Sequence, residues 1–166
     1  SAVGRVGLAF GMKAIAWSQN LTAEKAAEQG VERVEKDELF RLSDILSVHL
    51  VLSPRSRGLV GTREIGLMKP TAILVNTSRG PIVDEKALHE ALVARKLAGA
   101  GLDVFEQEPP PTGQPLHGLP NVIMAPHVAG VTVEAVDRMS EQTARNILSA
   151  LEGAPIRQNV INQDLL

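Results

Sequence analysis

The chain has 166 residues, about the length of one ordinary domain. With 44% hydrophobic and 22% charged residues, its composition is that of a folded globular domain and excludes a disordered chain. The 17 basic and 19 acidic residues give a net charge of -2, so nucleic acid is not an expected partner. Cysteine is absent, which excludes disulfides and Cys-based zinc or redox sites, and no bound metal is expected.

The distribution of apolar residues narrows the class of protein further. No apolar run approaches the roughly 18 residues of a membrane-spanning helix, and the N-terminus lacks the pattern of a signal peptide. We therefore expect a cytoplasmic protein that does not bind membranes. Three Phe, one Trp and no Tyr leave the core to Ala, Val, Ile and Leu, which is typical of layered α/β domains.

Short aliphatic segments alternate with amphipathic segments along the chain. Most of the aliphatic segments are apolar on both faces, as parallel strands covered by helices on both sides are. Their alternation with helices predicts right-handed crossovers and a doubly wound, three-layer α/β sheet. After a small-residue helix at 1–11, we expect strands at 13–17, 45–52, 71–76, 97–104 and 121–125, and helices at 22–29, 36–42, 62–68, 84–96 and 132–151.

The start of the chain departs from this alternation, because the helix at 1–11 has no strand in front of it. Gly4 and Gly7 have a G-x-x-G spacing, but without a preceding strand and a G-x-G they cannot form the phosphate turn of a dinucleotide-binding fold. We expect these glycines to serve helix packing instead.

Chemically capable side chains follow three successive predicted strands. Ligands of open parallel sheets bind at the carboxyl ends of the strands, so these side chains are candidates for one site. Thr77, Ser78 and Arg79 follow the strand at 71–76; Asp103 and Glu108 follow the strand at 97–104; His127, Ala129 and Gly130 follow the strand at 121–125.

These candidates also have simpler interpretations. Arg79 could form a surface ion pair, Asp103 could merely end its strand, and Glu108 could be a solvated carboxylate in a Pro-rich loop. The turn at Gly80-Pro81 favours a fixed presentation of Arg79, and the Pro and Gly residues around His127 favour a ligand near the backbone. Non-catalytic roles are expected for His49, His89 and His117.

Three ordered segments together resemble a known family. Residues 75–84 (VNTSRGPIVD), 101–109 (GLDVFEQEP) and 119–130 (LPNVIMAPHVAG) are similar to signatures of the NAD(P)-dependent D-isomer-specific 2-hydroxyacid dehydrogenases. The resemblance implies an oxidoreductase that moves hydride between NAD(P)H and a small D-2-hydroxy acid or 2-oxo acid, such as glycerate/hydroxypyruvate or glycolate/glyoxylate. It also implies a homodimer, a Rossmann-like domain over 1–152, and a segment at 153–166 that returns toward a substrate domain.

The resemblance assigns roles to the candidate residues. Arg79 would bind the substrate carboxylate and polarise its carbonyl, His127 would be the general acid/base, and Glu108 would orient the imidazole. Negative charge develops on the carbonyl oxygen during reduction, so a proton donor and a fixed cation suit this reaction. An acidic partner for His127 disfavours formate dehydrogenase, whose histidine has an amide partner. Cofactor contacts would come from Ser18, Thr77, Ser78, Arg79, Asp103, His127, Ala129 and Gly130, with Asp103 near the nicotinamide.

The choice of cofactor and the completeness of the domain stay open. Ser18 stands where an acid normally holds the ribose of NAD, which slightly favours NADP(H) or dual use, although no cation follows it directly. The first strand and its G-x-G-x-x-G turn are expected to precede residue 1. Two alternatives are a nucleotide-sensing corepressor on the same fold, and a fragment that is inactive by itself because it lacks the phosphate turn.

Overall fold

The computed structural model describes residues 2–165, which form two units with a boundary between residues 127 and 128. The second unit contains α6 (Val133–Leu151) and two short 3-10 helices, Arg157–Asn159 and Gln163–Leu165. The elements of the first unit are, in chain order, α1 (Ala2–Ala9), β1 (Ile15–Ala16), α2 (Ala23–Ala27), β2 (Glu32–Arg33), α3 (Lys36–Leu42), β3 (Ile45–Val48), α4 (Thr62–Leu67), β4 (Ile73–Asn76), η1 (Gly80–Ile82), α5 (Glu85–Val93), β5 (Gly99–Leu102), η2 (Pro115–Gly118) and β6 (Val122–Met124).

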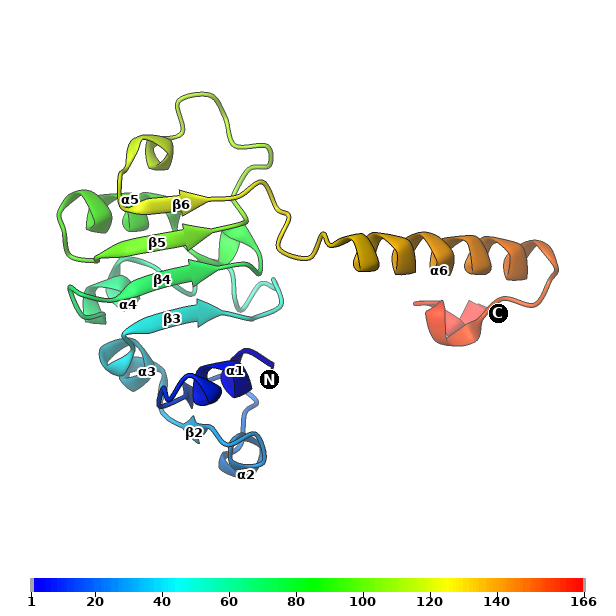
Figure 1. Cartoon of the computed structure of the whole chain (residues 1–166), viewed down its shortest axis with the longest axis horizontal. Helices are drawn as coiled ribbons and strands as arrows, with labels where there is room; N and C mark the ends of the chain where they lie inside the picture. The colour runs from blue at the N-terminus through cyan, green and yellow to red at the C-terminus, as the bar shows by residue number, and fades with distance from the viewer. Residues whose placement is uncertain (1, 166) are drawn as a thin grey trace. The chain divides into compact units, whose positions relative to one another are not determined.

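The strands of the first unit form two parallel sheets. β3, β4, β5 and β6 lie side by side in chain order, as Figure 1 shows, and β1 pairs with β2 in a separate two-stranded sheet. This arrangement confirms the predicted parallel α/β fold. The sequence did not predict β2, because Glu32 and Arg33 are polar and only their backbones pair with Ile15 and Ala16.

The core lies on one face of the four-stranded sheet. Leu46, Leu74 and Leu102 point into it, while Ile45, Ile73 and Ile123 on the opposite face are exposed. Burial of one such aliphatic side chain stabilises the fold by about 1.5–3 kcal/mol. The largest side chains that are fully buried are Leu74, Ile82, Leu88, Leu92, Leu97 and Leu116, which come from β4, α5 and the segments around them.

The helices begin where the sequence predicts. The side chains of Thr22, Asp84 and Thr132 each accept a hydrogen bond from a backbone N–H in the first turn of α2, α5 and α6. Among residues 2–165, no helix is both long and apolar enough to cross a membrane. The division into residues 1–152 and 153–166 stays a prediction.

Candidate active site

The last residue of β4 shapes the turn that carries Arg79. The Asn76 side chain is buried; its Nδ2 donates to the Arg79 carbonyl at 3.0 Å and its Oδ1 accepts from the Ser78 amide at 3.1 Å. The Ser78 hydroxyl in turn donates to the Leu50 carbonyl beyond β3. These bonds fix the backbone of the turn and leave the Arg79 side chain exposed at the carboxyl end of the sheet.

Gly80 allows the segment after β5 to pass directly against this turn. A Cβ at Gly80 would lie 1.9 Å from the Phe105 carbonyl carbon and 2.5 Å from the Glu106 amide nitrogen. No side chain fits in that space, so only glycine permits the approach. The turn that presents Arg79 and the loop that carries Glu108 are thereby held together.

Glu108 and His127 form a hydrogen-bonded pair at the carboxyl end of the sheet. His127 Nδ1 lies 2.7 Å from Glu108 Oε2, while Glu108 Oε1 accepts from the Phe105 amide at 3.0 Å. The His127 and Glu108 side chains are 45% and 36% exposed, so both remain accessible from solvent. His127 has a φ of 57°, in the left-handed region that histidine adopts more readily than most residues. The backbone after β6 therefore turns sharply where it presents the ring.

The electrostatics of the site keep Glu108 ionised. The hydrogen bond to His127 lowers the pKa of the Glu108 carboxyl, and the Phe105 amide and the charge of Arg79 lower it further. Arg79 is thus close enough to act on the pair through its charge. A carboxylate that holds Nδ1 fixes the tautomer of the ring, which leaves Nε2 to exchange a proton with a bound molecule. A hollow of about 220 Å³ adjoins the pair and is lined by Phe105, Glu108, Pro109, Pro110, Pro126 and His127.

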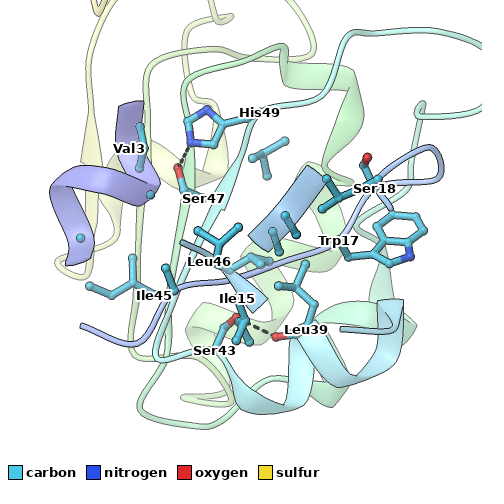
Figure 2. Close-up of a pocket in the computed structure, with 18 of the residues that line it drawn as sticks. Val3, Ile15, Trp17, Ser18, Leu39, Ser43, Ile45, Leu46, Ser47 and His49 are labelled. Carbon is cyan, nitrogen blue, oxygen red and sulfur yellow. Dashed lines mark hydrogen bonds between the residues drawn. The ribbon is translucent and has the colours of Figure 1, made fainter. Parts of the chain in front are cut away.

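A larger hollow of about 810 Å³ separates β1 from β3. Figure 2 shows residues of its lining from β1 (Ile15), β3 (Leu46), α1 (Val3) and α3 (Leu39). Ser18 and His49 line the same hollow, and each stands just beyond the carboxyl end of its strand. Ser18, a predicted cofactor contact, therefore lies at the carboxyl edge of the first unit.

The other predicted contacts are placed as follows. Asp103 directly follows β5, is buried, and donates its backbone N–H to the Asn76 carbonyl at 3.0 Å. Thr77 follows β4 and is exposed. Ala129 and Gly130 belong to the second unit, where both are exposed and precede α6.

The structure also brings to this site three polar side chains that sequence reasoning missed. Asn76 donates to the Arg79 carbonyl, while Glu85 accepts from the Glu106 amide and from the side chain of Gln114. A strand-ending asparagine and a glutamine before Pro115 are weak signals in a sequence. Glu85 directly follows an N-cap, where an acidic residue is common for its effect on the helix dipole alone.

Comparison with known proteins identifies the family. Residues 1–129 match the family described as "D-isomer specific 2-hydroxyacid dehydrogenase, NAD binding domain". A glyoxylate reductase of Korarchaeum cryptofilum is 42% identical over 166 residues, which are 100% of this chain and 50% of that protein. A D-3-phosphoglycerate dehydrogenase of Methanocaldococcus jannaschii is 42% identical over 155 residues, which are 93% of this chain and 29% of that protein.

A solved structure of a D-2-hydroxyacid dehydrogenase has the same fold as this chain. The D-lactate dehydrogenase of Aquifex aeolicus, complexed with NAD and lactic acid, superposes with a TM-score of 0.82 at 32% identity, over 92% of this chain and 50% of that one. The chain thus spans half or less of the length of these relatives. The match over residues 1–129 shows that the chain belongs to the D-isomer specific 2-hydroxyacid dehydrogenase family, within its NAD-binding domain.

Proposed function

We propose that this chain is the cofactor-binding part of an oxidoreductase that moves hydride between NAD(P)H and a small D-2-hydroxy acid or 2-oxo acid. The observation that carries the proposal is the Glu108–His127 pair at 2.7 Å, with Arg79 close enough to lower the pKa of Glu108. A cation, a carboxylate and an imidazole at the carboxyl ends of successive parallel strands suit the reduction of a 2-oxo acid.

Each side chain has a distinct role in this proposal. Arg79 binds the substrate carboxylate and stabilises the negative charge that develops on the carbonyl oxygen. His127 gives its proton to that oxygen, or takes it back in the reverse direction, and Glu108 stabilises the imidazolium. The bound cofactor supplies or accepts the hydride. Ser18 would contact its ribose, Asp103 would lie toward its nicotinamide, and Thr77 would be a further cofactor contact.

Turnover by the whole enzyme tests this proposal. We expect glyoxylate or hydroxypyruvate to drive the loss of NADH or NADPH absorbance, because the reduced nicotinamide supplies the hydride. The ratio of kcat/KM with NADPH to kcat/KM with NADH measures the cofactor preference, which Ser18 is expected to shift slightly toward NADPH. Tight cofactor binding without turnover of any 2-oxo acid would contradict the proposal and favour a nucleotide-sensing protein.

We further propose that cofactor binding requires another parallel strand between β1 and β3. Among the described residues, β1 pairs only with β2 and β3 pairs only with β4, so two strand edges face each other across the larger hollow. Its mainly aliphatic walls, including Ile15 and Leu46, suit an apolar strand. Such a strand would end beside Ser18 and His49, where a glycine-rich turn could offer backbone N–H groups to phosphates.

Calorimetric titration with NADH and NADPH tests whether cofactor binding requires this further strand. The 166-residue chain should bind NADH and NADPH far more weakly than the whole enzyme, because it lacks the donors of that turn. A dissociation constant in the micromolar range for the chain alone would contradict this expectation.

The homodimer stays a prediction, and the exposed Val133, Met139 and Ile147 of α6 offer apolar surface for it.

A further inference from the structure

The loop that carries Glu108 has few internal bonds to fix it. It runs from the buried Phe105 to the buried Gln114, and the residues around Glu108 are exposed. Three consecutive prolines at 109–111 have no N–H to donate. The position of the Glu108 carboxylate therefore depends on contacts between this loop and the rest of the domain.

Glu85, the first residue of α5, binds both ends of this loop. Its Oε1 accepts from the Glu106 amide at 2.6 Å, and its Oε2 accepts from Gln114 Nε2 at 2.6 Å. The two partners lie 21 and 29 residues away along the chain. Gln114 is itself fixed, because its Oε1 accepts from the Leu116 amide at 2.9 Å. One carboxylate thus closes the loop at its start and at its end.

A short series of contacts links Glu85 to the imidazole. The Glu106 amide bound by Glu85 is adjacent to Phe105, whose own amide donates to Glu108 Oε1. The other oxygen of Glu108 lies against His127 Nδ1. A shift of the loop start would therefore move the carboxylate that orients the ring.

Helix capping does not account for this arrangement. Asp84 is the N-cap of α5 and accepts from the Ala87 amide at 2.9 Å, whereas both oxygens of Glu85 accept from the loop. Burial raises the pKa of Glu85, and the nearby Glu106 carboxylate raises it as well, while the two accepted hydrogen bonds act against this. The carboxylate is kept in an unfavourable place by the bonds that it makes to the loop.

We infer that Glu85 is a positioning residue, which fixes the loop at Glu106 and Gln114 and thereby holds Glu108 on His127 Nδ1. The kinetic part of this inference rests on the proposed function. The geometric part concerns the Glu108–His127 pair alone and holds for any chemistry at the site.

Substitutions of Glu85 in the whole enzyme test the inference. Glu85→Ala removes both bonds and should lower kcat/KM by on the order of 100-fold, since small misplacements of catalytic groups have effects of this size. Glu85→Gln keeps one accepting oxygen and should lower kcat/KM by about tenfold. Glu90→Gln changes an exposed glutamate on the same helix and should leave kcat/KM unchanged.

Nitrogen-15 NMR of histidine-labelled whole enzyme supplies a readout that does not need turnover. The wild type and Glu90→Gln should show the resonance of a protonated, hydrogen-bonded Nδ1 at His127, whereas Glu85→Ala should show exchange between the two tautomers. A Glu85→Ala enzyme that is only less stable to urea, with unchanged kcat/KM and an unchanged His127 resonance, would overturn the inference. If the wild type turns over no 2-oxo acid, the proposed function fails, and the NMR comparison still decides the role of Glu85.

Discussion

His127→Asn should lower kcat/KM of the whole enzyme for a 2-oxo acid by on the order of 100-fold or more. An imidazole can pass a proton to a bound molecule, and Glu108 holds Nδ1 of the His127 ring at 2.7 Å. Asparagine cannot transfer the proton. Steady-state kinetics with glyoxylate and NADPH measure the loss, and an unchanged rate would contradict the role of His127.

Asparagine is the appropriate replacement because of the backbone at this position. The φ of 57° strains most side chains, but asparagine adopts the left-handed region with little cost. An alanine would combine the loss of the imidazole with backbone strain. His117→Asn provides the matched control, because His117 is an exposed histidine in η2 and lies outside the proposed site. The control should retain the wild-type rate.

The same substitution has a consequence that does not depend on turnover. The hydrogen bond to His127 is the largest cause of the lowered pKa of Glu108, so its loss should raise that pKa. A carboxyl with a lowered pKa in the folded protein adds stability above its unfolded-state pKa and loses that contribution as the pH falls through the folded value. In His127→Asn, the carbon-13 titration of Glu108 should move to higher pH.

The sequence predicted those elements in which a hydrophobic pattern begins next to a residue that caps a helix. α3 agrees residue for residue with the prediction, and α2, α5 and α6 begin within one residue of their predicted starts, directly after the N-caps Thr22, Asp84 and Thr132. β2 could not be predicted, because Glu32 and Arg33 form it through backbone pairing with β1 and carry no apolar signal. Tertiary pairing decides the conformation of such short polar strands.

In the candidate site, too, some features could be predicted from the sequence and others could not. Arg79, Glu108 and His127 could be predicted, because each follows a strand and parallel strands bring their carboxyl ends together. The hydrogen bonds that hold these three residues in place could not be predicted. Asn76 is read as part of an aliphatic strand, and the bonds of Glu85 join residues 21 and 29 positions apart with no local pattern. Contacts between two loops produce no recognisable pattern in the sequence of either loop.

Gly80→Ala should destabilise the whole enzyme by about 3 kcal/mol, at the upper end of the usual cost of overpacking. The new Cβ would lie 1.9 Å and 2.0 Å from the carbonyl carbon and oxygen of Phe105, so the backbone of one segment must move. Urea unfolding followed by circular dichroism measures the loss. Because the same movement separates Arg79 from the Glu108 loop, kcat/KM of the folded fraction should also fall.

Gly66→Ala separates this steric effect from the general effect of a methyl group on glycine. A Cβ at Gly66 meets no heavy atom within 4 Å, and the residue lies in α4, where alanine is favoured over glycine by up to about 1 kcal/mol. The control should therefore be as stable as the wild type or slightly more stable. Equal stability of the two variants would show that the Phe105 backbone moves aside freely, and the turn after β4 would then not fix the loop that carries Glu108.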